Sequence, residues 1–173
     1  MKRNINIFLV SLLIAFASCS FTSKSFDDDP DKDKLLMQLI TYLLEQGHFE
    51  PKVINDELSV GVYTSFLDQI DPFKNYFIQS DINEFEQFKT ELDDQILAHD
   101  VSFFNLVYDR FLVRFEDSKN RYSKVLELPF DFNLEEEYST DYENSPYVKT
   151  KSQMFNRWRK QLKFYTISNY HDL

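Results

Sequence analysis

Apolar residues recur at intervals of three or four positions through most of this chain, which is the periodicity of helices that bury one face. The first such segment begins at Lys34 and stops at Gly47, a residue type that commonly ends helices. A second follows Asn55, which can cap a helix, and ends at Asp71-Pro72, because the residue before a proline is disfavoured in the α region. The two apolar stripes are Leu36, Leu39, Ile40, Leu43 and Leu44, and then Leu58, Val62, Phe66 and Ile70.

The clearest helical pattern begins at Asp81, which forms a capping box with Glu84 and predicts one helix continuing to about Ile96. A longer helix is predicted over Ser102–Glu127, with Pro129 as its terminator, and its length suits the spine of a bundle. The stripes are Ile82, Phe85, Phe88, Leu92 and Ile96 in the first helix, and Phe104, Val107, Tyr108, Phe111, Phe115, Tyr122 and Leu126 in the second.

The last part of the chain predicts a loop and then a helix. Residues Glu135–Pro146 are acidic and have no apolar period, whereas Ser152 opens a helix with an apolar stripe beside basic residues. The basic residues could contact phosphate, but a solvated face or a contact with another part of a larger protein suits so acidic a chain better. The stripe is Phe155, Trp158, Leu162 and Tyr165, and the basic residues are Arg157, Arg159, Lys160 and Lys163.

Composition supports helices and argues against strands joined by tight turns. The 173 residues include only 2 glycines, which such turns need, but 18 phenylalanines, which suit packing between helices. We therefore predict an all-α fold, a single bundle-like domain of about five helices over residues 34–173. Phe-rich stripes could also line a groove for an apolar peptide, but the interior of the chain's own domain is the better interpretation.

The amino terminus resembles an export signal. A basic start precedes an apolar run, Ile5 to Ala17, that is too short to span a bilayer, and Cys19, the only cysteine, follows small residues. Residues 1–18 are therefore predicted to be a lipoprotein signal peptide, with Cys19 as the lipidated first residue of the mature protein. The alternative is an ordinary secretory signal cut near Ala17. Either signal places the rest of the chain on the periplasmic side of the cell envelope.

Residues 19–33 contain a run of aspartates and almost nothing to bury, so we predict a flexible acidic tether. A calcium loop is disfavoured, because the EF-hand pattern counted from Asp27 requires a glycine sixth and a glutamate twelfth. This sequence has Lys32 and Gln38 at those two positions.

Charge and residue spacing exclude several classes of function. The formal charge of −10 becomes −12 once Lys2 and Arg3 leave with the signal peptide, so no nucleic-acid partner is expected. The histidines at 48, 99 and 171 lack a second ligand at metal-binding spacing, and no serine lies in a nucleophile motif. Acidic pairs such as Asp93-Asp94 are better explained as solvated surface. We expect no catalytic residue, no metal site and no cofactor.

Four blocks of sequence are distinctive together: Phe66–Asp71, Ser80–Leu92, Leu126–Phe132 and Trp158–Lys163. In this order and at these separations they resemble the amino-terminal domain of bacterial tail-specific proteases, also called carboxy-terminal processing peptidases. The similarity covers about Asp31 to the end of the sequence.

This resemblance implies a helical domain that, in complete members, precedes a PDZ domain and a protease body with a serine and lysine dyad. Such enzymes cut exported proteins near their carboxyl ends. A lysine that is held away from water loses its proton and activates the serine hydroxyl. The sequence departs from that pattern by stopping at Leu173, so no dyad residue can be carried over and the chain alone is expected to be inactive.

The partners implied are the remainder of the protease, protein substrates or an adaptor, and a membrane through lipid on Cys19. Phe155, Trp158 and Leu162 are predicted to pack onto the missing domains. The competing interpretation is a stand-alone helical lipoprotein that binds a protein partner. A third, weaker one is a hydrolase whose carboxylates meet only on folding.

Overall fold

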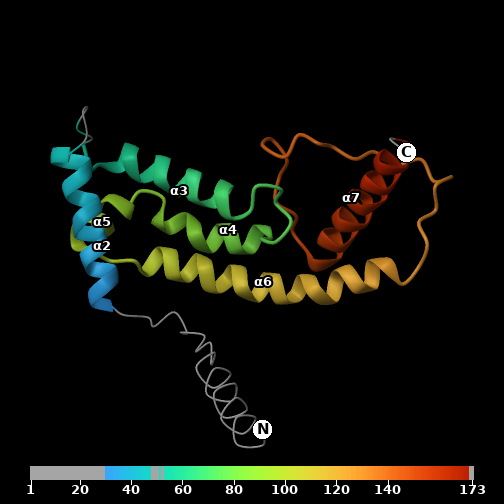
Figure 1. Ribbon diagram of the computed structural model, residues 1–173, viewed down its shortest axis with the longest axis horizontal. Coiled ribbons are helices and arrows are strands. Elements are labelled where there is room, and N and C mark those ends of the chain that lie inside the picture. The colour runs from blue at the N-terminus through green and yellow to red at the C-terminus, as the bar shows by residue number, and fades with distance from the viewer. Residues whose placement is uncertain (1–29, 48–50, 52, 172–173) are drawn as a thin grey trace, which may run out of the picture. The chain divides into compact units, whose positions relative to one another are not determined.

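The computed structural model describes residues 30–47, 51 and 53–171 of the chain. All regular elements in this part are helical, so the predicted all-α fold is confirmed (Figure 1). The predicted signal peptide, Cys19 and most of the predicted tether lie outside the described residues. The elements are α2 (Pro30–Tyr42), the π-helical turn η1 (Leu43–Gly47), α3 (Asp56–Ile70), α4 (Gln79–Phe85), the 3-10 turn η2 (Glu86–Phe88), α5 (Leu92–Ala98), α6 (Ser102–Leu126) and α7 (Lys151–His171).

The core forms where α3, α4 and α6 run side by side (Figure 1). Phe77, Phe85 and Phe103 are fully buried there. The Phe103 ring lies 5.6 Å from that of Tyr63 on α3, and Phe77 meets Phe85 edge-on at 5.4 Å. Tilted and edge-on ring pairs of this kind are favourable beyond the apolar area they bury. The phenylalanines therefore couple the helices to one another, as their abundance predicted.

The prediction of a single helix from Asp81 to Ile96 was wrong, because the helical backbone is interrupted between η2 and α5. Ser59 of α3 is fully buried beside the break. Its hydroxyl donates to the carbonyl of Lys89 at 3.0 Å and accepts from the N–H of Leu92 at 2.8 Å. These two bonds satisfy backbone groups that the break would otherwise leave buried and unpaired. The apolar period continues across the break, which is why the pattern alone concealed it.

The predicted capping box was also wrong in register. Asp81 is the third residue of α4 and does not precede the helix. Its carboxylate accepts a hydrogen bond from the N–H of Ile78, the residue before the helix, at 3.0 Å. In a capping box, the side chain of the third helical residue accepts from the N–H of the residue before the helix. Asp81 has this role here, whereas the prediction gave it to Glu84.

The most buried faces of α3 and α6 coincide only partly with the predicted stripes. Val107 is buried as predicted, and several other stripe residues pack half-buried against the core: Val62, Phe66, Ile70, Phe104 and Phe111. The buried positions include serine and arginine residues, which a hydrophobicity pattern assigns to the surface. The pattern therefore misplaced the centre of the buried face on each helix. The buried residues are Ser59, Tyr63 and Leu67 on α3, and Phe103, Val107, Ser118, Arg121 and Val125 on α6. The predicted residues that are instead exposed on α6 are Tyr108, Phe115, Tyr122 and Leu126.

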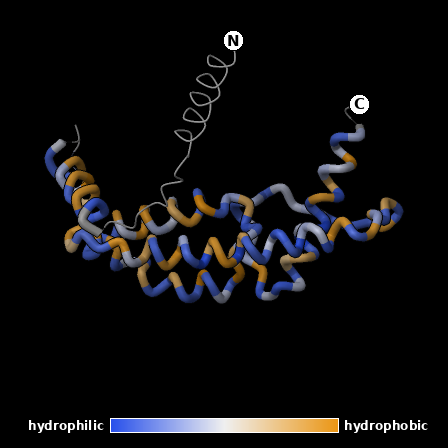
Figure 2. The backbone as a smooth tube through the Cα atoms, turned by 60° about the horizontal axis from the view of Figure 1, so that its bottom comes forward, coloured by the Kyte–Doolittle hydropathy of each residue, from blue (hydrophilic) through white to orange (hydrophobic). Residues whose placement is uncertain are grey.

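Helix α2 begins at Pro30, earlier than the predicted start at Lys34, and proline suits the first position of a helix. It buries Met37, and the Thr41 hydroxyl lies 3.4 Å from the carbonyl of Ile96 on α5. Most of its predicted apolar stripe stays exposed, and hydrophobic residues are visible along α2 in Figure 2. None of the helices described here is both long and apolar enough to cross a bilayer.

Candidate functional site at the junction of α6 and α7

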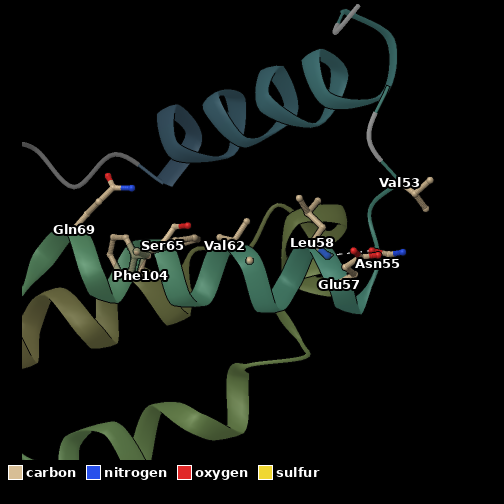
Figure 3. Close-up of a pocket in the computed structure, with 10 residues that line it drawn as sticks. Val53, Asn55, Glu57, Leu58, Val62, Ser65, Gln69 and Phe104 are labelled. Atoms are coloured by element: carbon tan, nitrogen blue, oxygen red, sulfur yellow. Dashed lines mark hydrogen bonds between the residues drawn. The ribbon is translucent and has the colours of Figure 1, made fainter. Parts of the chain in front are cut away.

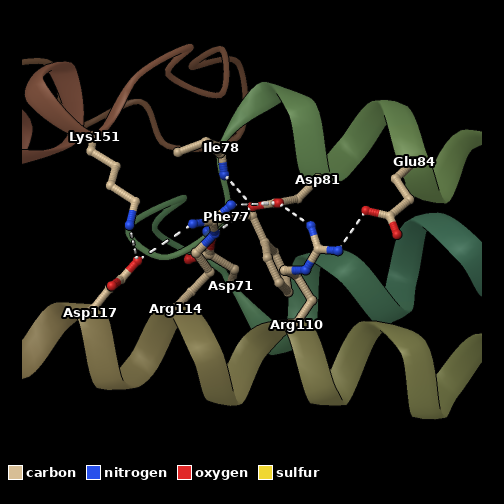
Figure 4. Close-up of polar contacts among 9 residues, drawn as sticks. All are labelled: Asp71, Phe77, Ile78, Asp81, Glu84, Arg110, Arg114, Asp117 and Lys151. Atoms are coloured by element: carbon tan, nitrogen blue, oxygen red, sulfur yellow. Dashed lines mark hydrogen bonds and ion pairs between the residues drawn. The ribbon is translucent and has the colours of Figure 1, made fainter.

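A buried carboxylate ties α4 to α6 (Figure 4). Asp81 accepts hydrogen bonds from Arg110 Nη1 at 2.6 Å and from Arg114 Nε and Nη2 at 2.8 and 2.7 Å. Arg114 therefore binds the carboxylate in the bidentate geometry that is strongest for this pair. Burial alone would raise the pKa of Asp81, but hydrogen bonds from Arg114, the Ile78 N–H and Arg110 outweigh burial and lower it.

One turn further along α6, an ion pair joins this helix to the first residue of α7. Asp117 accepts from Lys151 Nζ at 2.9 Å and lies 3.4 Å from Arg114 Nη1 (Figure 4). These contacts, Lys151 first, lower the pKa of Asp117. Lys151 is the first residue of α7, where the helix dipole disfavours a cation, and the aspartate offsets that cost.

A second buried aspartate shapes the turn between α3 and α4. Asp71 accepts hydrogen bonds from the N–H groups of Asn75, Tyr76 and Phe77 at 2.7, 3.1 and 2.9 Å. Burial raises the pKa of Asp71, and these three donors together with Arg157 limit the rise. The predicted end of the second helix at Asp71-Pro72 is confirmed, and the aspartate also organises the chain beyond it.

Helix α7 binds this turn at Asn75 through the side chains of Gln161 and Trp158. The Asn75 side chain donates to Gln161 Oε1 at 2.8 Å, and the Trp158 indole N–H donates to the Asn75 carbonyl at 2.9 Å. Asn75 and Gln161 are both buried, so their contact is sheltered from water. The first half of α7 is consequently fixed to the turn.

The four basic residues that the sequence singled out on α7 all bind the chain's own turn and acidic loop. Such a loop was predicted over Glu135–Pro146, and this stretch is free of helix. Arg159 and Lys163 both bind the carboxylate of Glu136, which lowers its pKa to about 2. The backbone contacts are Arg157 to the carbonyls of Lys74 and Pro146, both at 2.7 Å, Lys160 to Glu137 at 3.1 Å, and Lys163 to Leu134 at 2.8 Å.

The residues predicted to contact further domains are half-buried within this one. Trp158 is held by its hydrogen bond to Asn75 and by the Tyr76 ring, whose centre lies 6.2 Å away. Phe155 lines a pocket between α6 and α7, and Leu162 is half-buried one turn beyond Trp158. The structure brings all three to the α7 junction, and their contact with further domains stays a prediction.

The second half of α7 carries large exposed apolar side chains, of which only Tyr165 was singled out in the sequence. Phe164, Tyr165, Ile167 and Tyr170 are 38%, 40%, 48% and 80% exposed. The Tyr138 ring of the acidic loop packs on Phe164 at 5.3 Å. Tyr165 was predicted to be buried, which was wrong. The three-residue spacing of Phe164, Ile167 and Tyr170 is the sequence signal that could have revealed a second apolar side.

An open groove of about 800 Å³ runs along α3 (Figure 3). Nothing lies within 4 Å of the place where a side chain on Gly61 would begin, so the groove is open beside this residue. Phe66 and Phe104 in its lining belong to the Phe-rich stripes that were considered, without a fixed position, as the lining of a groove for an apolar peptide. Its apolar lining is Val53, Leu58, Val62, Phe66 and Phe104, and its polar lining is Asn55, Glu57, Ser65 and Gln69.

The chemistry offered by these surfaces is ion pairing and apolar contact. Over residues 30–47, 51 and 53–171, no three His, Cys, Asp or Glu side chains gather as a metal site. His99 occupies the left-handed position that ends α5, His171 is the last residue of α7, and His48 lies outside the described residues.

Comparison with known proteins finds a family model and curated relatives that are similar to this chain. Residues 40–173 match the family model described as the tail specific protease N-terminal domain. The tail-specific protease of Haemophilus influenzae is 25% identical over 134 residues, which cover 77% of this chain and 19% of that protein. The chain thus spans about a fifth of the length of this curated relative.

Proposed function

Because the chain belongs to the tail-specific protease N-terminal domain family, we propose that it is the non-catalytic helical domain of an exported tail-specific (carboxy-terminal processing) serine protease. In this role it scaffolds the protease and assists the binding of substrates or an adaptor. The cutting itself belongs to a protease body with a serine and lysine dyad, which follows a PDZ domain elsewhere in the complete protein. Support comes from the matched relative, in which the corresponding region is a small part of a much longer protease.

The observation that carries this proposal is the contrast between the two halves of α7. Its first half is fixed by Trp158 and Gln161, whereas its second half presents Phe164, Ile167 and Tyr170 to solvent. Apolar side chains gathered on one exposed helix segment are typical of surfaces that another domain covers. We assign the following part of the same polypeptide as the occupant of this surface, with Phe155, Trp158 and Leu162 at its edge.

Reading the coding DNA beyond the codon for Leu173 tests the proposal directly. We expect an in-frame PDZ domain followed by a serine and lysine dyad. A reading frame without them would contradict the proposal and favour the competing interpretation, a stand-alone helical lipoprotein that binds a partner.

The α7 surface makes a separate prediction. We expect the polypeptide encoded after Leu173, produced separately, to bind this chain, and Ile167→Asp combined with Tyr170→Asp to weaken binding by about tenfold or more. The physical reason is that a carboxylate buried in an apolar contact costs more than about 1.4 kcal/mol. Isothermal titration calorimetry measures both affinities.

The matched control is Tyr108→Asp, at a residue of α6 that is 54% exposed. A change at such a surface position should leave the affinity within about twofold of the parent. Equal affinities for the parent and the double α7 variant would show that α7 does not form the contact.

Lipid anchoring is the second part of the proposal. We propose that lipid on Cys19 holds the domain on the periplasmic side of a membrane, supported by the apolar run and small residues before that cysteine. Cys19→Ala should move the protein from the membrane fraction to the soluble fraction, since Cys19 is the one cysteine of this sequence that can carry the lipid. Immunoblots of separated fractions measure this, with Ser20→Ala as the matched control. A Cys19→Ala variant that stays in the membrane fraction would contradict lipidation.

A further inference from the structure

A basic pocket of about 380 Å³ lies between the second half of α6 and the first turns of α7. It is lined by Asp117, Asn120, Arg121, Lys124, Lys151 and Phe155. Three of these six residues are cations, although the chain as a whole has a formal charge of −10. The pocket is therefore a local exception to the negative field of the protein.

The single carboxylate in the lining does not neutralise these cations. Asp117 is already bound by Lys151 at 2.9 Å and by Arg114 at 3.4 Å. Because Lys151 begins α7, the positive end of that helix dipole lies at the same place. An additional anion would be favoured here by both the side chains and the helix.

Arg121 lines this pocket, and its guanidinium includes a buried donor without a partner. Only 8% of the residue is exposed, yet its Nη1 atom has no hydrogen-bond partner among the described residues. Burial lowers the pKa of Arg121, although a guanidinium stays charged at neutral pH. A buried charged donor without an acceptor is costly and uncommon in native proteins, so it calls for a partner.

The Trp158 ring holds this guanidinium in place. The Arg121 guanidinium carbon lies 5.6 Å from the centre of the indole ring, within the range of a cation–π contact. Trp158 is in turn fixed by its hydrogen bond to the Asn75 carbonyl. The arginine is thus positioned in advance, which reduces the entropy lost when it binds a ligand.

We propose that this pocket binds a single carboxylate group, with Arg121 as the main donor and Lys124 and Lys151 as supporting charges. A planar carboxylate matches the edge of a guanidinium, which can bind its two oxygens through two parallel N–H donors. The carboxylate can come from the end of a peptide chain or from an acidic side chain. This inference does not rest on the proposed function.

Trp158 is the only tryptophan in the chain, so its fluorescence reports on the pocket directly. The probes are N-acetyl-dialanine with a free carboxylate, the same peptide as its amide, N-acetyl-glutamyl-alanine amide, and inorganic phosphate, all at constant ionic strength. We expect a saturable change with a Kd of about 1 mM for N-acetyl-dialanine, because one charge-assisted pair and two lysines supply a few kcal/mol. The neutral amide should produce none.

The two carboxylate probes distinguish the sources of the ligand. A response to the free terminus alone assigns the pocket to chain ends, and a response to the glutamyl amide as well assigns it to carboxylates in general. Phosphate that binds more tightly than either peptide would overturn the carboxylate assignment.

Variants separate binding from folding. Arg121→Lys keeps the charge but loses the planar fork, and should weaken binding by about tenfold. Because Arg121 is buried, the exposed Lys124→Gln provides a second variant, expected to weaken binding about threefold, and Lys119→Gln on the same helix is the unchanged control. The proposal fails if the folded parent shows no saturable change, if the amide gives the same change, or if Lys124→Gln binds like Lys119→Gln.

Discussion

Replacing Asp81 with alanine is expected to lower the free energy of unfolding by about 3–5 kcal/mol. Asp81 is fully buried and is the common acceptor for Arg110, Arg114 and the Ile78 N–H. Its removal leaves the Arg114 side chain, only 12% exposed, without its bidentate partner. Urea denaturation followed by circular dichroism measures the loss.

Glu84→Gln is the matched control for this prediction. Glu84 binds the same Arg110 at 2.7 Å, but its side chain is 37% exposed. A pair so open to water is worth less than about 1 kcal/mol. If the two variants lost equal stability, burial of the carboxylate would not be the source of the effect.

The pH dependence of stability should follow the same carboxylate. Since the pKa of Asp81 is lowered by folding, its contribution is complete above the unfolded value of about 3.9 and is lost as pH falls through the lower folded value. Glu136 and Asp117 also have lowered pKa values, whereas that of Asp71 is raised. Only the difference between the parent and Asp81→Asn therefore isolates Asp81. That difference should shrink below about pH 4, and a difference independent of pH would contradict this account.

Phe103→Ala is expected to cost about 3–5 kcal/mol of stability, because it removes a whole ring from the centre of the core. Phe103 is fully buried, and its ring lies 5.6 to 5.8 Å from those of Tyr63, Phe66 and Phe88. No water can fill an apolar cavity of this kind favourably, so the loss includes both the transfer energy and the cavity. Thermal and urea unfolding measure it.

Tyr108→Ala on the same helix tests specifically which face of α6 is buried. Tyr108 belongs to the stripe predicted from sequence but is 54% exposed, so its truncation should cost less than about 0.5 kcal/mol. A large loss at Tyr108 with a small loss at Phe103 would restore the predicted stripe and contradict the observed packing.

Element boundaries were predictable where the local chemistry determines them. The end of α3 at Asp71-Pro72, the cap at Asn55 and the extent of α6 all match the sequence prediction. In each place the boundary is set by a local feature of the sequence, namely a capping residue, a proline or an apolar periodicity that continues along the helix. The acidic loop before α7 was equally clear, because it has no apolar period at all.

The candidate site was only partly predictable. The α7 junction was identified through Trp158, but its partners Asn75 and Arg121 were not, since they lie far away in the sequence. Arg110, Arg114 and Arg121 face inward on α6, where a pattern of apolar residues offers no signal. Their long side chains can bury their stems while the charged ends find partners such as Asp81.

The sequence by itself determined an all-α chain, the approximate limits of most of its helices and its family, because backbone propensity, caps and apolar periods act locally. Only the tertiary structure decided which face of each helix is buried, where the helix after Asp81 breaks, and that α7 leaves apolar side chains uncovered. Those features depend on pairs such as Ser59 with Leu92 and Asp81 with Arg114, whose polar groups must be satisfied by distant residues once water is excluded.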